Sequence, residues 1–575
     1  MIKKLAPCVG EYKKYAILTP IVMIGEVVME VLIPFVMAKI IDVGIRGTGG
    51  IDYTVKMGLL MVLMAMISLG FGAIGGRLAA IAAMGFAKNV RKSLFDKVQD
   101  FSFANVDRFS TASLVTRLTT DVTNTQNAFM MLIRMAARAP IMLIGATIMA
   151  ISINSKLAII FLIAIPVLGF SLFFIIKNAH PRFGKMLKKY DEMNSKVQEN
   201  LVGIRVVKAF VREKQENEKF DAGADAVRKA QVFAEKLVIC NMPIMQICMY
   251  GCIVAVLWFG GNMVIDGSFD IGELSSFISY VTQILMSLMM LSMIFIMVII
   301  SRASVTRIVE VLDEEIDIKD NEKALDLKVK DGSIEFKNVS FSYSNDKEKL
   351  ALENINLSIQ SGETIGIIGG TGSGKTSLVQ LIPRLYDVME GELCVGGENV
   401  KDYSLVELRN SVAMVLQKNV LFSGTIKENL MWGDEHATQE EIEEACKSAC
   451  AHDFVMSFPD GYETDLGQGG VNVSGGQKQR LTIARALLKK PKIVILDDST
   501  SAVDTATDAK IRKAFREKLK GTTTIIIAQR IASVCDADRI IVMEDGKIDA
   551  FGTHDELMKN NKIYQEVYES QQKGE

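Results

Sequence analysis

The chain contains 575 residues, of which 49% are hydrophobic and 23% charged, and its formal net charge is −2. This composition is too apolar for an ordinary soluble enzyme and too charged for a chain that lies wholly in lipid. It indicates one membrane part and one soluble part, and it excludes intrinsic disorder, collagen and a disulfide-stapled secreted domain. The near-neutral charge also argues against a nucleic-acid partner.

Six apolar stretches occur in the first 305 residues, and each is near the ~20 residues that cross a bilayer. They are Tyr15–Lys39, Met57–Met84, Phe129–Ile153, Lys156–Lys177, Leu237–Gly261 and Leu274–Ile300. The links after the second and fourth stretches are long and rich in Lys and Arg, which is typical of cytoplasmic loops. We therefore expect an all-α six-span transmembrane domain over residues 1–305, in the cell membrane, with both termini cytoplasmic.

The two long inner links carry helix-forming sequence that extends the membrane helices into the cytoplasm. Within them, residues 109–120 and 199–212 form short amphipathic segments. Such segments are either solvated loop helices or contact elements between the membrane part and the soluble part.

The first apolar stretch contains two carboxylates, Glu26 and Glu30, which lie four residues apart and therefore on one helical face. Carboxylates within a membrane span are costly and are functional candidates by default. They could face a substrate cavity and attract a cationic compound, or they could pair with a base such as Arg77 or Arg134. Five methionines along the last stretch (Met286, Met289, Met290, Met293 and Met297) suit either an adaptable binding wall or ordinary packing.

The character of the sequence changes after the last apolar stretch. Residues 306–332 are charged and predict a linker. From residue 333 to 575, short β-branched runs alternate with helical segments, which predicts an α/β domain with a partly parallel sheet.

A glycine-rich motif gives the soluble part its chemistry. Gly369, Gly370, Thr371, Gly372, Ser373, Gly374, Lys375 and Thr376 fit the pattern G-x-x-x-x-G-K-[ST]. An apolar strand precedes the motif and a helix from Ser377 follows it, as a phosphate-binding loop requires. In such a loop the lysine reaches the β- and γ-phosphates and the threonine ligates Mg²⁺. A second strand ends at Asp497, the expected carboxylate partner of that Mg²⁺. The motif predicts ATP and Mg²⁺ as cofactors.

Downstream motifs resemble those of ABC transporter ATPases. Val473 followed by Ser474, Gly475, Gly476 and Gln477 is similar to the family's signature, usually LSGGQ. The resemblance implies that Tyr343 stacks on adenine, that Gln417 senses Mg²⁺ and that Asp504 belongs to the D-loop. With six spans ahead of these motifs, the whole chain resembles an ABC exporter half-transporter. The resemblance further implies coupling helices near 109–120 and 199–212, and pairing of two half-transporters around two ATP molecules.

Two positions depart from the family pattern. Asp498 stands where the family usually has the glutamate that polarises the attacking water, and Gln529 stands where it has the switch histidine. Aspartate is one methylene shorter, and a misplacement of about 1 Å can cost ~10²-fold in rate. Loss of a positioned acid or base typically costs ~10²–10⁴-fold. We expect a site that binds MgATP and scarcely hydrolyses it.

The pattern as a whole predicts one subunit of a heterodimeric exporter, similar to bacterial multidrug exporters. The signature of this chain would complete the ATP site of a partner half-transporter that keeps the glutamate and the histidine. Small amphipathic compounds are the expected substrates, and the lipid bilayer is the other partner. The alternatives are an exporter of lipids or peptides, a slow homodimeric pump, and an ATP-gated membrane regulator.

Overall fold

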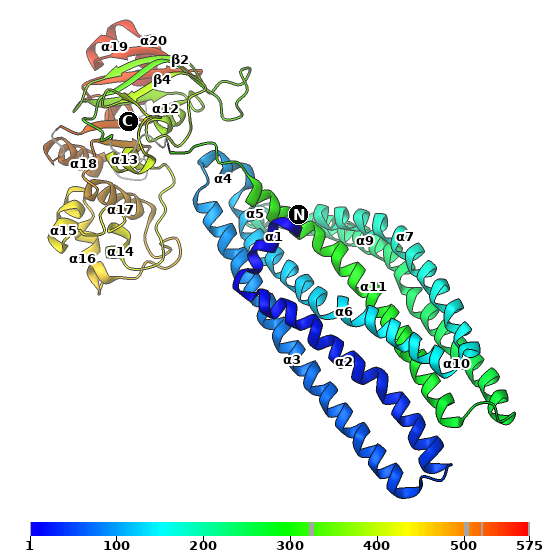
Figure 1. Ribbon diagram of the computed structural model, residues 1–575. Helices are drawn as coiled ribbons and strands as arrows, with labels where there is room; N and C mark the ends of the chain where they lie inside the picture. The colour runs from blue at the N-terminus through cyan, green and yellow to red at the C-terminus, as the bar shows by residue number, and fades with distance from the viewer. Residues whose placement is uncertain (1, 321–326, 499–504, 519–520, 573–575) are drawn as a thin grey trace. The chain divides into compact units, whose positions relative to one another are not determined.

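The protein is described from a computed structural model that covers residues 2–320, 327–498, 505–518 and 521–572 (Figure 1). The chain divides into two compact units. The first comprises Met1–Gln99 and Ser110–Glu314, and the second comprises Asp100–Phe109 and Glu315–Glu575. The ten residues from Asp100 to Phe109 therefore belong to the second unit, although both neighbouring segments of the chain belong to the first.

The first unit consists of helices. They are α1 (Ile2–Leu5), a 3-10 helix (Ala6–Tyr12), α2 (Lys13–Lys39), a π-helical segment (Ile40–Ile45), α3 (Gly50–Gln99), α5 (Thr111–Thr116), a second π-helical segment (Arg117–Asp121), α6 (Val122–Ile153), α7 (Ser155–Val202), α8 (Ile204–Ala209), α9 (Glu213–Ile239), α10 (Asn241–Ile265) and α11 (Ile271–Asp313). The long helices pack in pairs, with α2 along α3, α6 along α11 and α7 along α9 (Figure 1).

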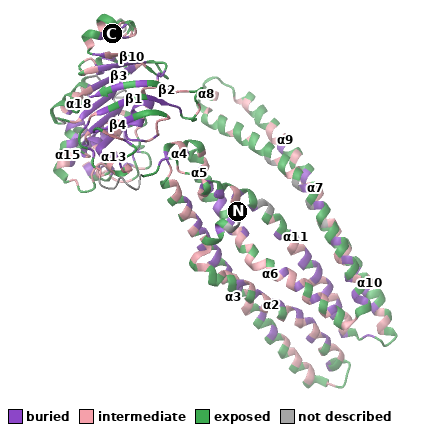
Figure 2. Ribbon diagram, turned by 45° about the horizontal axis from the view of Figure 1, so that its top comes forward, coloured by how far each residue is buried: buried purple, intermediate pink, exposed green. Residues whose placement is uncertain are grey.

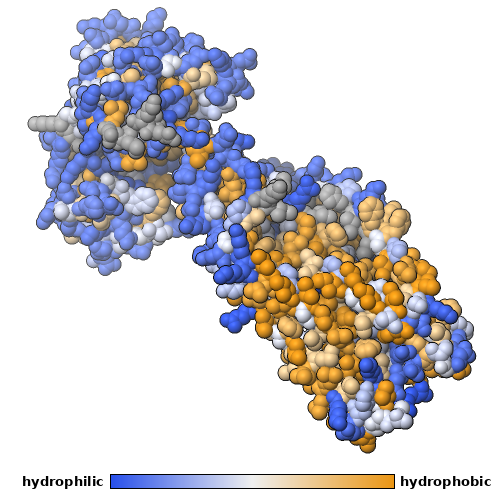
Figure 3. Space-filling model, viewed as in Figure 1, coloured by the Kyte–Doolittle hydropathy of each residue, from blue (hydrophilic) through white to orange (hydrophobic). Residues whose placement is uncertain are grey.

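Six helical segments of the described chain are long and apolar enough to cross a membrane, which confirms the six predicted spans. These segments are Ala6–Ile45, Gly50–Gln99, Thr111–Ile153, Ser155–Val202, Glu213–Ile265 and Ile271–Asp313. The surface of the first unit is broadly hydrophobic over these helices (Figure 3). Many residues of these helices are exposed (Figure 2), and a large share of the exposed ones are apolar, as is expected of positions that face lipid.

The interior of the membrane unit is packed around α2, α6 and α11. Ala146 and Ala150 on α6 are fully buried, and so is Tyr280 on α11. Small residues allow helix backbones to approach closely in a membrane. The Tyr280 hydroxyl donates to the backbone oxygen of Val31 on α2 at 2.8 Å, so this polar atom is satisfied within the apolar interior.

Both amphipathic links are interrupted helices. The first contains α4 (Phe103–Phe109), which belongs to the second unit, and then α5. The backbone breaks at Ser110, whose φ is +56° and whose side chain accepts from the Ser113 amide as the N-cap of α5. In the second link, α7 ends at Val202, and the short helix α8 follows. The next two residues along the chain, Phe210 and Val211, are apolar and exposed.

The second unit contains two sheets. The strands are β1 (Ile334–Phe341), β2 (Leu352–Ile359), β3 (Thr364–Gly369), β4 (Glu390–Val395), β5 (Glu398–Asn399), β6 (Val412–Val415), β7 (Ile493–Asp497), β8 (Thr523–Ile527), β9 (Arg539–Glu544) and β10 (Lys547–Gly552). One sheet is antiparallel in the order β2-β1-β4-β5. The other has the order β10-β9-β3-β8-β7-β6 and is parallel except for β10.

Helices surround these sheets. They are α12 (Lys375–Leu381), α13 (Leu405–Ser411), α14 (Ile426–Leu430), α15 (Gln439–Ser448), α16 (His452–Met456), α17 (Gly475–Leu488), α18 (Thr505–Lys518), α19 (His554–Asn560) and α20 (Lys562–Gln572). Short 3-10 turns occur at Gly461–Glu463 and Ile531–Ser533. Helices α14 and α15 pack on α17 and form a helical group beside the sheet (Figure 1). The predicted α/β architecture is therefore confirmed.

The parallel strands bring the candidate residues together. Strands β3, β7 and β8 are buried on both faces, as their unbroken apolar runs predict for a parallel sheet. Asp497 pairs with Ile527, and Ile527 pairs with Ile367. The residues that follow these strands therefore meet at one edge of the sheet, where parallel α/β sheets place their ligand sites.

Candidate functional site

The glycine-rich loop follows β3 and leads directly into α12. A side chain at Gly369 would place its Cβ 2.2 Å from the Met543 backbone oxygen, so only glycine fits. Gly374 has a φ of +92°, a conformation that L side chains rarely adopt, and it is the N-cap of α12. The loop thereby presents backbone N–H groups at a helix N-terminus, which favours a phosphate group.

Lys375 lies folded over this loop. Its ammonium group donates to the backbone oxygens of Gly369 and Gly370 at 2.9 and 2.6 Å. Burial lowers the pKa of Lys375, and the nearby carboxylates of Asp497 and Asp498 act in the opposite direction. A phosphate would offer the lysine charged acceptors in place of carbonyl oxygens, and charge-assisted hydrogen bonds are the stronger ones.

Thr376 and Asp497 form the pair that could hold a cation. The Thr376 hydroxyl donates to Asp497 Oδ1 at 3.1 Å, and Asp497 is buried at the end of β7. Burial raises the pKa of Asp497, whereas the Thr376 hydrogen bond lowers it. A hydroxyl and a carboxylate beside a phosphate loop fit Mg²⁺, because this ion takes one or two protein oxygens and completes its shell with phosphate and water. When bound, Mg²⁺ would neutralise phosphate charge at this point.

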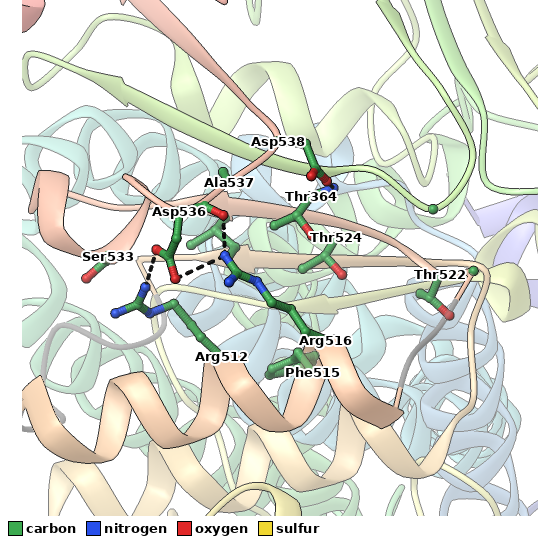
Figure 4. Close-up of a pocket in the computed structure, with 13 residues that line it drawn as sticks. Thr364, Arg512, Phe515, Arg516, Thr522, Thr524, Ser533, Asp536, Ala537 and Asp538 are labelled. Atoms are coloured by element: carbon green, nitrogen blue, oxygen red, sulfur yellow. Dashed lines mark hydrogen bonds and ion pairs between the residues drawn. The ribbon is translucent and has the colours of Figure 1, made fainter. Parts of the chain in front are cut away.

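Cavities of about 310, 320 and 550 Å³ lie in the described part of the second unit, and the one of 550 Å³ borders the phosphate loop. The loop cavity, 550 Å³, is lined by Tyr343, Gly372–Ser377, Asp545 and Gly546, among other residues. The cavity of 310 Å³ is shown in Figure 4. It lies at the starts of β3 and β8, at the ends of these strands that are opposite to the phosphate loop. Its arginines Arg512 and Arg516 both pair with Asp536, and Arg512 also pairs with Asp508.

Tyr343 lies at the edge of the loop cavity and is half exposed. Its hydroxyl is 2.9 Å from the Ser377 hydroxyl, and its ring packs edge-on against Tyr386 at 5.1 Å. The Tyr386 hydroxyl in turn donates to Asp107 on α4 at 2.7 Å, and the Phe103 ring of α4 packs on Tyr386. An aromatic cluster therefore joins the phosphate loop to α4 within the second unit.

The two residues that depart from the family pattern contact each other. Gln529 donates from its side-chain amide to Asp498 Oδ2 at 2.9 Å, and Gln417 approaches the same oxygen at 3.5 Å. Asp498 has a φ of +47°, an uncommon conformation for a residue other than glycine. Such backbone outliers concentrate at functional sites. Asp498 directly follows β7, and Gln529 and Gln417 each lie two residues after the ends of β8 and β6. The three side chains therefore lie at the same edge of the parallel sheet.

The signature segment starts α17. Ser474 is the N-cap: its hydroxyl accepts from the Gln477 amide at 3.3 Å, and the Gln477 side chain accepts from the Ser474 amide at 2.8 Å. This reciprocal capping box fixes the start of a 14-residue helix. Ser474 and Gly475 are exposed, so their polar groups face outward from this chain. Asp504 and the rest of the predicted D-loop lie outside the described residues.

The membrane carboxylates form an ion-paired cluster. Arg138 on α6 contacts Glu26 Oε1 at 2.9 Å and Glu30 Oε1 at 2.8 Å. The structure thus pairs both carboxylates with Arg138, and not with the bases Arg77 or Arg134 that the sequence suggested. The ion-pair alternative is thus found with a different arginine, because the rotation of α6 against α2, which one sequence does not reveal, decides which arginine faces the carboxylates.

A phosphate loop on a parallel sheet, joined to six apolar helices, defines a nucleotide-driven membrane transporter. Comparison with known families identifies the type. Residues 17–306 match the model of the ABC transporter transmembrane region, and residues 352–501 match the ABC transporter model. The chain belongs to the ABC transporter family and is an ATP-driven ABC exporter, a half-transporter with its membrane domain fused to its ATP-binding domain.

Relatives cover nearly the whole chain. An uncharacterized ABC transporter ATP-binding protein of Bacillus subtilis, YfiB, is 39% identical over 97% of this chain and 97% of its own length. YgaD of the same organism, called a putative multidrug export ATP-binding/permease protein, is 33% identical over 99% of both chains. The solved structure of a bacterial Atm1-family ABC exporter with ATP bound has a TM-score of 0.83 and covers 97% of this chain and 98% of its own, at 24% identity. It shows the shared fold.

Proposed function

We propose that this chain binds MgATP at its own phosphate loop. Lys375 and the loop amides hold the phosphates, Thr376 and Asp497 hold Mg²⁺ with Gln417 nearby, and Tyr343 stacks on adenine. The folded-over Lys375, the buried Thr376–Asp497 pair and the cavity beside Tyr343 support these roles. ABC exporters work as dimers, so the signature residues Ser474–Gln477 would meet ATP held by another subunit.

The chain's own site would hydrolyse ATP slowly. The observation that carries this proposal is the Gln529–Asp498 hydrogen bond of 2.9 Å. An amide cannot accept a proton as an imidazole does, and here its N–H is directed to the carboxylate that would have to polarise water. Asp498 is shorter than glutamate and already accepts a hydrogen bond from the Gln529 amide, so it is poorly placed to act as a general base.

The asymmetry between the two motifs favours a heterodimer. The exposed, well-capped signature is intact and would serve a sound site, whereas Asp498 and Gln529 spoil this chain's own site. A partner half-transporter with the glutamate and the histidine would supply the hydrolysis. A slow homodimeric pump is the alternative.

Two segments would carry motion between ATP and the membrane helices. The first is α4, which precedes the predicted segment 109–120, belongs to the second unit and is bonded there to Tyr386 through Asp107. The second is the predicted segment 199–212, which contains α8 and exposes Val206, Phe210 and Val211. Exposed apolar patches of this kind mark interaction sites. We place the membrane domain at 1–305, the linker at 306–332 and the ATP-binding domain at 333–575, with both termini cytoplasmic because of the basic inner links.

The proposed cargo is a small amphipathic compound. Two relatives at 33% identity, from Bacillus subtilis and Staphylococcus aureus, are called putative multidrug export proteins. The methionines on the last span suit a wall that adapts to different apolar shapes. Lipid or peptide export, and ATP-gated regulation without pumping, are the rival functions, and ATP-driven uphill uptake into inverted membrane vesicles separates pumping from gating.

The decisive experiment repairs the site. The double variant Asp498→Glu/Gln529→His should raise ATP hydrolysis by the purified chain about 10²-fold, because it restores both missing groups. Asp498→Asn should change turnover of the assembled heterodimer less than twofold, whereas the corresponding Glu→Gln change in the partner should nearly abolish it. Brisk hydrolysis by the unmodified chain alone, or equal losses from the two single variants, would reject the asymmetric assignment.

A further inference from the structure

The polar cluster inside the membrane unit has unsatisfied acceptors. Arg138 forms an ion pair with Glu26 Oε1 and donates hydrogen bonds to both carboxylate oxygens of Glu30. Glu26 Oε2 is buried and has no hydrogen-bond partner among the described residues. The Glu26 side chain keeps only 9% of its surface exposed, so water does not compensate this oxygen. A buried carboxylate oxygen without a donor is costly and demands an explanation.

A second orphan acceptor belongs to the same cluster. Gln283 on α11 donates from its amide nitrogen to the backbone oxygen of Glu30 at 3.1 Å. Its side-chain oxygen, Oε1, is buried and lacks a partner in the described chain. Three helices, α2, α6 and α11, thus converge on a site in which two buried acceptor oxygens have no donor among the described residues. Within a membrane such a site is a functional candidate.

The net charge of the cluster does not by itself indicate which ligand would bind to the two unpartnered oxygens. Arg134 lies one turn before Arg138 on α6 and attracts Glu26 from a greater distance, so two arginines and two glutamates balance formally. What the cluster lacks is N–H donors at two places. A ligand that supplies them together with a positive charge would form charge-assisted hydrogen bonds in surroundings of low dielectric, where such bonds are strongest.

An apolar wall extends from this cluster along α11. Gln283, Met286, Met290, Met293 and Met297 recur at intervals of three and four residues and therefore share one helical face. Met286 and Met293 are more than half exposed in the chain. Glu30 and Arg138 keep 29% and 20% of their side-chain surfaces exposed, so the cluster is open on one side. Polar acceptors thus border a deformable apolar surface.

We infer that Glu26 and Gln283 form a subsite for the protonated amine of an amphipathic cargo whose apolar body lies on the Met286–Met293 face of α11. Glu26 Oε2 and Gln283 Oε1 accept the ammonium hydrogens, and Arg138 holds the Glu26 carboxylate in place. This inference names the cargo class of the proposed exporter and rests on that proposal only for the direction of transport.

A matched pair of fluorescent probes tests the subsite. Dansylcadaverine carries a primary ammonium group, and its N-acetyl derivative has the same apolar body without the charge. Binding of each probe is titrated to the full-length chain in lipid nanodiscs without ATP, with empty nanodiscs subtracted. The wild-type chain should bind the amine about tenfold more tightly than the acetylated probe, the gain expected from one good charged contact.

Glu26→Gln is the principal variant, since it keeps an oxygen for Arg138 and removes the charge. It should abolish the preference by weakening the amine about tenfold while leaving the acetylated probe unchanged. Exposed Glu218 on α9 provides the matched control, and Glu218→Gln should preserve the preference. If the preference survives in Glu26→Gln, or if both probes weaken equally there, the inference is overturned.

Three further variants show whether a loss of binding comes only from damage to the fold. Arg134→Gln removes a repelling charge and should bind the amine more tightly, a gain that misfolding cannot produce. Met286→Ala should weaken both probes alike, whereas Met66→Ala, at an exposed methionine on α3, should weaken neither. ATP-driven uptake by inverted vesicles is then measured separately. A preserved binding preference without uptake would refute the export function and leave the subsite standing.

Discussion

The two sides of the nucleotide site differ in how completely they are built. On the phosphate side, Lys375, Thr376 and Asp497 have the residue types of a phosphate loop, and they contact the loop backbone and each other. On the side where water would be activated, Asp498 and Gln529 satisfy each other. Under the proposed roles, binding and hydrolysis depend on separate groups of one site. A chain can therefore keep one property and lose the other.

The largest effect is expected when the phosphate side of the site loses its lysine. Lys375→Ala should weaken ATP binding to this chain about 100-fold, because the ammonium group is the main charged partner available to the phosphates. Binding is measured by equilibrium titration of a fluorescent ATP analogue to the full-length chain. Lys401→Ala, at an exposed lysine of the same unit, is the control and should bind normally. Unchanged affinity in Lys375→Ala would show that the phosphates are held elsewhere.

The second prediction separates this chain's own site from the site that we propose its signature completes in a partner. Ser474→Asp preserves the cap of α17, because aspartate is as good an N-cap as serine, and it places a negative charge where ATP of the partner would lie. Turnover of the assembled transporter should fall about 10²-fold, the loss typical of a missing anion-stabilising donor. ATP binding to Lys375's own loop should not change.

An uncharged N-cap residue at position 474 separates the effect of charge from the effect of helix shape. Ser474→Asn keeps the N-cap and adds no charge, so steady-state ATP turnover should fall much less than in Ser474→Asp. Equal losses in the two variants would assign the effect to the shape of the helix start. A large loss of nucleotide binding by the isolated chain would contradict the view that the signature serves the other site.

The sequence predicted the contiguous parts of this site and missed the parts that depend on packing. The phosphate loop, Asp497 and the six spans could be found because a local pattern defines each of them. Arg138 lies 108 residues from Glu30, and Tyr386 lies 279 residues from Asp107. No local pattern specifies such pairs, since they follow from how helices rotate and where α4 docks. An arginine in an apolar span was the available signal for the first pair; nothing comparable marked the second.

The smallest effect is expected at Tyr386, whose ring packs against Tyr343 at the edge of the phosphate-loop cavity. Tyr386→Phe keeps the ring that packs on Tyr343 and removes the hydroxyl that donates to Asp107. Because Asp107 is exposed and regains water, the loss should be about 1 kcal/mol, which corresponds to roughly fivefold faster hydrogen exchange in α4. Exchange is followed by mass spectrometry of the full-length chain.

Tyr403 offers the matched control for this last comparison. Its hydroxyl donates to the Val395 backbone oxygen at 2.8 Å, in the same unit and away from α4. Tyr403→Phe should therefore destabilise the antiparallel sheet without accelerating exchange in Phe103–Phe109. If Tyr386→Phe leaves exchange in α4 unchanged, ring packing by Phe103 holds this helix, and the hydrogen bond to Asp107 contributes nothing to its docking. If both variants accelerate it equally, α4 responds to the stability of the whole unit, and the aromatic cluster beside the phosphate loop has no special connection to the membrane helices.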